Sequence, residues 1–218
     1  MEPNFILDAV AKADRFESRL SREAIDVPFL GSLKIRALLN NLGAGAKHVL
    51  EIGSHKGGSL CSTVFANDNI ETVTAIDSWE SDHMAGEGGE SAYLQFIENI
   101  NKFKSKETAL DIIISDCWSV DLSRIKKPID LYGYDAGHSY EDQKMALTYY
   151  KPAMAQKFVY CVDDYHYGDV KRGTIDGILE CGFEIIQECE LTNTTKGDDL
   201  HLNDEWWRGY GVFLLAKK

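Results

Sequence analysis

The chain of 218 residues is long enough for one domain with extensions, or for two small domains at most. Hydrophobic residues make up 44% of it, which is enough for a sizeable core and argues against a disordered chain. The formal net charge of −12 has the opposite sign to that of a nonspecific nucleic-acid or anionic-membrane binder, so neither partner is expected.

The cysteines and the N-terminus indicate the compartment. Five cysteines are scattered along the chain without a C-x-x-C pair, so neither a zinc ribbon nor a disulfide framework is predicted. The first residues lack the basic segment of a signal peptide, and no apolar stretch reaches the roughly 20 residues of a membrane span. We expect a soluble, cytoplasmic protein with reduced thiols.

The first part of the chain is predicted to be mostly helical. Apolar residues between positions 6 and 42 fall close to a helical stripe, which Gly43 and Gly45 end. We therefore treat residues 1–45 as an N-terminal helical extension or lid, and residues 46–218 as the main domain.

Beyond this point short apolar runs alternate with amphipathic stretches, the order typical of an α/β fold with a mainly parallel sheet. The runs are continuous rather than alternating, as in strands covered on both faces. The predicted strands are residues 48–52, 72–76, 110–114, 129–134 and 157–162. The predicted helices are residues 58–66, 91–103, 140–150 and 167–180. Two last runs, residues 183–191 and 210–216, lack a strong helix between them and are expected to pair antiparallel.

Two connecting segments are candidate lids or pocket walls. Residues 81–90 contain three glycines, and residues 192–208 are polar apart from Trp206 and Trp207. Long connections of this kind are usually functional or mobile. For residues 81–90, a surface insertion without function is an equal alternative.

The first strand leads into a glycine turn, with Glu51, Gly53 and Gly57 in the pattern E-x-G-x-x-x-G. His55 stands where a dinucleotide-binding fingerprint needs its second glycine, and the phosphate-binding loop pattern is also absent. Asp77 ends the second strand about twenty residues later, where an acidic side chain can accept both hydroxyls of a ribose. Together these features predict a nucleoside-cofactor site at the carboxyl ends of the strands.

Acidic side chains follow the fourth and fifth strands. Asp135 ends the fourth run, and Asp163 and Asp164 end the fifth. If these strands are neighbours, the three carboxylates converge, and a divalent cation would relieve their repulsion. All-oxygen ligation favours Mg²⁺, with Mn²⁺ or Ca²⁺ also compatible. The alternative is that Asp135 and Asp164 cap the helices that follow, while Asp163 is solvated.

The glycine turn, Asp77 and the strand order resemble those of the class I S-adenosylmethionine-dependent methyltransferases. The resemblance covers about residue 47 to the C-terminus and implies a Rossmann-like, seven-stranded, mostly parallel sheet with a C-terminal antiparallel strand pair and helices on both faces. It implies that the turn passes the methionine end of the cofactor, that Asp77 binds the ribose and that residues after the second and third strands surround the adenine. The implied cofactor-binding residues are Glu51, Gly53, Ser54, Gly57, Ser59, Asp77, Ser78, Trp79, Asp116, Cys117 and Trp118.

The sequence D-x-x-H-S-Y-E after the fourth strand, with D-D after the fifth, resembles the macrocin-type sugar O-methyltransferases. This resemblance implies that Asp135, Asp163 and Asp164 bind Mg²⁺ and that His138 is the catalytic base. His166 is a second-choice base. One departure is Met154-Ala155-Gln156-Lys157, where members often carry Gly-Gly before the fifth strand.

The expected function is methyl transfer from S-adenosylmethionine to a hydroxyl of a small molecule, namely a sugar, a phenol or a polyketide-type product. Three alternatives stay open: a metal-independent small-molecule N-methyltransferase, an NAD(P)-dependent oxidoreductase and a noncatalytic nucleotide-binding module. The expected partner is the small-molecule acceptor, and self-association is expected only by analogy with related enzymes.

Overall fold

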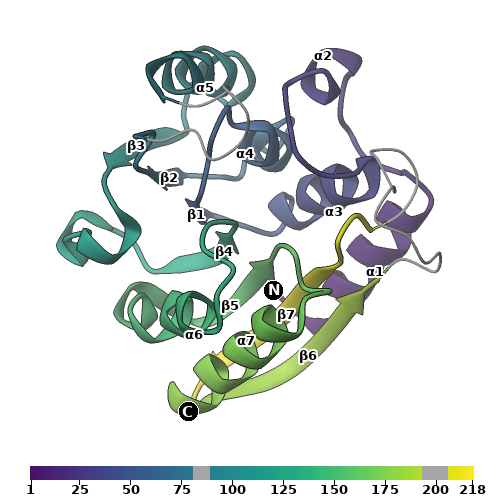
Figure 1. The fold of residues 1–218 in the computed structure, drawn as a ribbon. Coiled ribbons are helices and arrows are strands. Elements are labelled where there is room, and N and C mark those ends of the chain that lie inside the picture. Colours follow the sequence, from purple (N-terminus) through teal and green to yellow (C-terminus); the bar gives the residue numbers. More distant parts are fainter. Residues whose placement is uncertain (81–88, 193–205) are drawn as a thin grey trace.

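The computed structural model describes residues 1–80, 89–192 and 206–218, and its centre is one seven-stranded sheet (Figure 1). The strands lie in the order β3-β2-β1-β4-β5-β7-β6. Their bounds are β1 His48–Ile52, β2 Thr72–Asp77, β3 Ala109–Ile114, β4 Ile129–Tyr134, β5 Met154–Val162, β6 Phe183–Leu191 and β7 Tyr210–Lys217. The first five strands are parallel, and β7 is antiparallel to both β5 and β6. The predicted fold class is confirmed.

Helices cover both faces of the sheet (Figure 1). Buried residues of α1, α3, α4 and α5 belong to one hydrophobic cluster, and those of α6 and α7 belong to a second. The helices are α1 Pro3–Asp14, α2 Arg22–Ile25, α3 Leu33–Gly43, α4 Gly58–Val64, α5 Gly89–Phe103, α6 Tyr140–Thr148 and α7 Gly168–Glu180, with short 3₁₀ turns at Cys117–Ser119, Leu122–Arg124 and Lys151–Ala153. No helix among the described residues is both long and apolar enough to span a bilayer.

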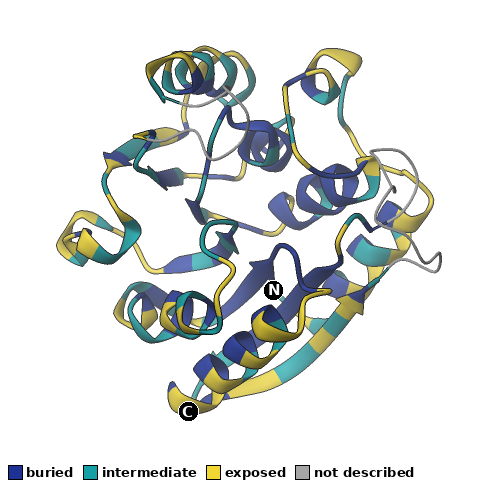
Figure 2. Cartoon of the chain, in the orientation of Figure 1, coloured by how far each residue is buried: buried dark blue, intermediate teal, exposed yellow. Residues whose placement is uncertain are grey.

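The strands are continuous apolar runs because both of their faces are covered. In β1, Val49 packs into the first hydrophobic cluster and Leu50 into the second, as the two-residue alternation of a strand requires. Figure 2 shows the central strands buried, while α7 has one buried and one exposed face. Residues within the central strands are therefore used in core packing, and residues available to bind a ligand are at the strand ends.

The N-terminal region, predicted to be mostly helical, contains three separate helices. It is divided into α1, α2 and α3, and serine side chains begin the two later helices. Ser21 accepts a hydrogen bond from the amide of Ala24, and Ser32 accepts one from the amide of Ile35. Each cap satisfies an amide that a helix start leaves unpaired, so the chain can turn between the helices.

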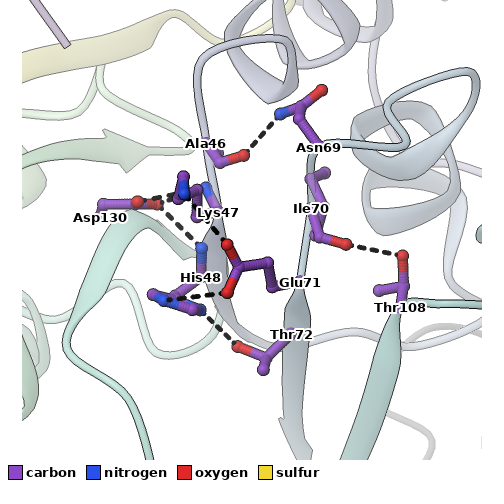
Figure 3. Close-up of polar contacts among 9 residues, drawn as sticks. All are labelled: Ala46, Lys47, His48, Asn69, Ile70, Glu71, Thr72, Thr108 and Asp130. Carbon is purple, nitrogen blue, oxygen red and sulfur yellow. Dashed lines mark hydrogen bonds and ion pairs between the residues drawn. The ribbon is translucent and has the colours of Figure 1, made fainter.

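Polar contacts tie together the amino ends of β1, β2 and β4 (Figure 3). The Asp130 carboxylate accepts hydrogen bonds from the amides of Lys47 and His48, each at 3.1 Å. Lys47 also forms an ion pair with Glu71, and the His48 ring contacts the Thr72 hydroxyl at 3.0 Å. The amino ends of these strands are therefore linked by contacts within the chain.

The carboxyl ends of the strands converge at the opposite edge. The amide of Gly53 donates to the carbonyl of Ile76 at 2.9 Å, and the amide of Asp135 donates to Ile52 at the same distance. The amide of Asp163 donates to Tyr134 at 3.3 Å. Interstrand bonding thus continues one residue past these strands and brings loops that are remote in sequence to one edge.

Candidate active site

A cavity of about 680 Å³ lies at the carboxyl ends of β1, β2, β4 and β5. Ligand sites of open α/β sheets occur at this edge. The predicted residues that line it are Gly53, Ser54, Ser59, Asp77, Ser78, Asp116, Cys117, Trp118, Asp135, His138, Asp163 and Asp164. The structure therefore places the glycine turn and the acidic strand ends around one hollow.

Gly53 makes this arrangement possible. Its φ is 87°, in the left-handed region that glycine adopts without strain. A Cβ at this position would overlap the carbonyl oxygen of Asp135. The turn after β1 and the end of β4 can therefore approach closely only because residue 53 has no side chain.

The Asp77 carboxylate is held by backbone amides of the turn after β1 and of the residues that follow β2. One of its carboxylate oxygens accepts the amide of His55 at 2.8 Å, and the other accepts the amide of Trp79 at 2.9 Å. A carboxylate oxygen can accept more than one hydrogen bond, so both oxygens retain capacity for the two hydroxyls of a ribose. This geometry fits the cofactor role predicted for Asp77.

Three predicted cofactor residues are not among those that line the cavity: Glu51, Gly57 and Trp79. Gly57 precedes α4 with a φ of 85°. The buried Trp79 ring packs against Phe96, with ring centres 5.2 Å apart, and its indole nitrogen donates to the carbonyl of His55 at 2.8 Å. Trp79 therefore supports the turn from within the core, whereas Trp118 is the predicted tryptophan that lines the cavity.

Glu51 and Ser54 place unpaired polar atoms at the glycine turn. Both residues are buried, and neither Oε1 of Glu51 nor the Ser54 hydroxyl has a hydrogen-bond partner among the residues that the structure describes. Burial raises the pKa of Glu51 to about 8, so its carboxyl group holds a proton at neutral pH. Because Ser54 also lines the cavity, its hydroxyl fits a polar group of a bound ligand.

His138 lies between two of the predicted metal ligands. Its Nε2 atom is 3.4 Å from Oδ2 of Asp164 and 3.8 Å from Oδ1 of Asp135. The backbone of Asp164 is left-handed, with a φ of 54°. Such conformations in residues other than glycine cluster at functional sites. The carboxylate of Asp164 can thus orient the imidazole.

The three clustered carboxyl groups oppose one another's ionisation. Burial and the negative charges of Asp135 and Asp164 raise the pKa of Asp163. Burial also raises the pKa of Asp135 and Asp164, while His138 lowers both of these values. A positive charge at this position would favour the ionised carboxylates.

The donor chemistry of this cluster fits a hard divalent cation, since Asp135, Asp163 and Asp164 supply only oxygen. Within the described ranges, however, no three His, Cys, Asp or Glu side chains are arranged to hold a metal ion. Asp164 instead faces His138 and Arg208. The three carboxylates line one cavity, and Mg²⁺ binding by them stays a prediction.

Several lining residues were not predicted as site residues: Pro28, Phe29, Leu30, His55, Lys56 and Arg208. Residues 28–30 lie between α2 and α3, inside the region predicted to be mostly helical. Arg208 follows the predicted wall residue Trp207, which also lines the cavity. The other candidate wall, residues 81–90, lies outside the described part of the chain up to residue 88.

The strand order, the antiparallel β7 and the cavity at the carboxyl edge define a Rossmann-like methyltransferase fold. Residues 50–165 match a protein family described as a methyltransferase domain. The match spans more than half of the chain and includes Gly53, Asp77 and the acidic cluster. The chain therefore belongs to this family.

Solved structures share the fold over most of the chain. A structure provisionally described as a caffeoyl-CoA O-methyltransferase from Staphylococcus aureus has a TM-score of 0.61 at 16% identity, covering 95% of this chain and 99% of its own. An O-methyltransferase from Bacillus cereus in complex with SAH has a TM-score of 0.54 at 10% identity, covering 99% and 92%. Cofactor-bound Rv0187 from MTB has a TM-score of 0.56 at 15% identity, covering 98% and 90%. No curated protein sequence matches the chain.

Proposed function

We propose that the protein transfers a methyl group from S-adenosylmethionine to a hydroxyl of a small molecule. The observation that carries this proposal is that the Gly53 turn, Asp77 and the His138–Asp164 pair line one cavity. A nucleoside site and a candidate base thus face the same space. The B. cereus structure was determined with SAH, the demethylated cofactor, which supports the choice of methyl donor.

The cofactor end of the cavity is assigned to the turn after β1 and to the ends of β2 and β3. Gly53 lets the backbone approach the ligand, and Asp77 accepts the ribose hydroxyls. Trp118 supplies an apolar wall beside Asp116, whose carboxylate accepts the Trp118 amide at 2.7 Å. We assign the adenine to this wall.

The acceptor end is assigned to His138 and its carboxylate neighbours. S-adenosylmethionine supplies a methyl group on a positively charged sulfur, so the protein has to position the acceptor oxygen and remove its proton. Alignment of two reactants can contribute about 7–11 kcal/mol. Proton removal by His138, with Asp164 holding the ring, would contribute roughly 10²–10⁴-fold. A divalent ion held by Asp135, Asp163 and Asp164 would lower the pKa of the acceptor hydroxyl.

The macrocin-type subgroup remains part of this proposal, because its motif residues Asp135, His138, Asp163 and Asp164 gather at one edge. A sugar, a phenol or a polyketide-type hydroxyl is compatible with the cavity. The experiments have to distinguish this O-methylation from metal-independent N-methylation, since a neutral amine needs less help from a base than a hydroxyl does.

Turnover of His138 variants tests the proposed base. Methyl transfer is screened against phenols, sugars and amines, with mass spectrometry locating the methyl group on oxygen or nitrogen. His138→Ala should lower kcat by about 10²–10⁴-fold while the affinity for S-adenosylmethionine is unchanged. The matched control is His48→Ala, because His48 lies at the amino edge of the sheet. Unchanged kcat in His138→Ala would remove the base assignment.

Metal dependence is measured separately. If Asp135, Asp163 and Asp164 hold a required ion, EDTA should abolish turnover and added Mg²⁺ should restore it. Asp164→Ala should match the EDTA-treated enzyme. Full activity in EDTA would leave a methyltransferase that works with its base alone, and a methylated amine as product would redirect the acceptor class.

A further inference from the structure

The turn that leads into β7 is fixed to the segment that follows β5. The amide of His166 donates to the carbonyl of Arg208 at 2.9 Å, and the amide of Tyr165 donates to the carbonyl of Gly209 at 3.1 Å. Gly209 has a φ of 79°, and a Cβ there would lie 2.7 Å from the amide nitrogen of His166. These backbone contacts hold Arg208 in the cavity wall.

The Arg208 guanidinium has two neighbours among the described residues, the Trp207 ring and the Asp164 carboxylate. Its central carbon lies 4.6 Å from the centre of the Trp207 ring, a cation–π distance. Its charged neighbour is Asp164, 3.7 Å from Nη1 to Oδ2, which is longer than a hydrogen bond. Because 45% of the Arg208 side chain is exposed, an ion pair of this length adds little stability. In the described part of the chain, no residue accepts a hydrogen bond from this guanidinium.

Arg208 and His138 approach the same oxygen atom. Oδ2 of Asp164 is 3.4 Å from Nε2 of His138 and 3.7 Å from Nη1 of Arg208. The guanidinium is therefore a close neighbour of the proposed base. A hydroxyl that reaches His138 would bring the next few atoms of its molecule within reach of Arg208.

The acidic residues that line the cavity are Asp77, Asp116, Asp135, Asp142, Asp163 and Asp164. Lys56 also lines the cavity, but it is buried in the glycine turn and only 8% exposed. Among the described residues that line the cavity, Arg208 is thus the exposed, permanently charged cation. In a chain with a net charge of −12, such a group can distinguish an anionic ligand from a neutral one.

We propose that Arg208 binds an anionic group of the acceptor, a carboxylate or a phosphate, that lies close to the methylated hydroxyl. This inference rests on the proposed function and narrows its acceptor to a hydroxy acid or a phosphorylated alcohol. The planar guanidinium can donate two parallel hydrogen bonds to a pair of oxygens. Its contact with the Trp207 ring restricts the positions of the guanidinium before the acceptor arrives.

Calorimetric titration with small probes tests the inference without knowledge of the natural acceptor. Benzoate, phenyl phosphate and neutral benzamide are titrated into the full chain, with and without saturating SAH. At least one anion should bind about tenfold or more tightly than benzamide, as a charge-assisted hydrogen bond would give. The tighter anion identifies carboxylate or phosphate as the recognised group.

Variants of Arg208 distinguish hydrogen bonding by the planar guanidinium from a general effect of its positive charge. Arg208→Gln should remove the preference for the anion, whereas Arg208→Lys should retain part of it, because lysine carries the charge without the planar fork. Arg172→Gln is the matched control, since Arg172 is an exposed arginine that pairs with Asp169 on α7. It should bind the probes as the wild type does.

Equal binding of all three probes by the wild type would overturn the inference, as would an anion preference that survives in Arg208→Gln. Failure of the proposed function gives a different result, because SAH would then show no heat of binding of its own. The titrations without SAH still report the anion preference in that case.

Discussion

At the scale of a single residue, Gly53 allows the turn after β1 to lie against the end of β4, where the two halves of the proposed site meet. Gly53→Ala adds a left-handed alanine, which costs roughly 1–2 kcal/mol, and a methyl group that overlaps the Asp135 carbonyl. We expect the free energy of unfolding to fall by more than the backbone strain alone, and SAH binding to weaken. Urea unfolding and calorimetry measure the two effects.

The control for Gly53 is Gly182, between α7 and β6. Its φ is 67°, and a Cβ there would meet no atom within 4 Å. Gly182→Ala therefore reports backbone strain without a steric overlap, and it should leave SAH binding intact. Equal losses of stability in the two variants, with normal binding in both, would show that the Gly53–Asp135 approach is unimportant.

Glu51 gives stability a pH dependence that can be isolated. Burial raises its pKa from the ordinary value of 4.5 to about 8, so between these pH values the folded chain keeps a proton that the unfolded chain releases. The contribution of Glu51 to stability therefore falls as pH rises through this window. Glu51→Gln mimics the protonated group, so relative to the wild type it should be more stable at pH 8, and the difference should shrink towards pH 4.5.

Urea unfolding of both proteins across this range measures the Glu51 effect. A stability difference that does not change with pH would show that Glu51 ionises in the folded chain as it does in the unfolded one.

At the scale of elements, the contact between α6 and α7 positions the strand-end loop that carries His138. A Cβ on Gly173 of α7 would overlap the carbonyl oxygen of Tyr140, the first residue of α6. Gly173→Ala should push the helices apart and lower the free energy of unfolding by about 1–3 kcal/mol. Because His138 lies two residues before α6, kcat should fall as well.

Gly168 is the matched control on the same helix, since a Cβ there would meet nothing within 4 Å. Gly168→Ala should not destabilise the protein, because alanine favours helix more than glycine does. Unfolding curves that coincide for the two variants would show that the helices can separate at no cost.

Individual helices and strands also differ in how well their bounds can be predicted from sequence. The strands Ile129–Tyr134 and Phe183–Leu191 match their predicted ranges. Ile129–Tyr134 is a short, largely buried run at the centre of the sheet, which has few other ways to be buried. β5 begins at Met154, three residues earlier than predicted, since Met154 pairs with Ile129 ahead of a register shift. Such pairing depends on a distant strand, so local sequence does not reveal it.

The candidate site was predictable where it follows from strand order. Asp135 and Asp163 meet because their strands are parallel neighbours. The direction of the Trp79 ring was not predictable, since it depends on core packing against Phe96. Arg208 ends the candidate wall segment 192–208, but it could not be singled out from sequence, because the backbone contacts that place it join residues about forty positions apart.

At the scale of the whole molecule, the proposed methyl transfer requires that the cofactor and the acceptor bind at two ends of one cavity. The sheet provides this arrangement by placing the turn after β1, Asp77 after β2 and the acidic ends of β4 and β5 at one edge. At the amino edge, Asp130, Lys47 and Glu71 contact one another or neighbouring backbone. The cavity lies at the carboxyl edge, so the ligands are expected there.

Calorimetric titration of S-adenosylmethionine into the wild-type chain and two variants tests this claim most directly. We expect one bound molecule per chain and at least about tenfold weaker binding in Asp77→Asn, through the loss of a charged acceptor. Binding should be unchanged in Asp68→Asn, since Asp68 is an exposed residue outside the cavity. A folded wild-type chain that gives no heat of binding at millimolar ligand, or equal affinity in Asp77→Asn, would contradict it.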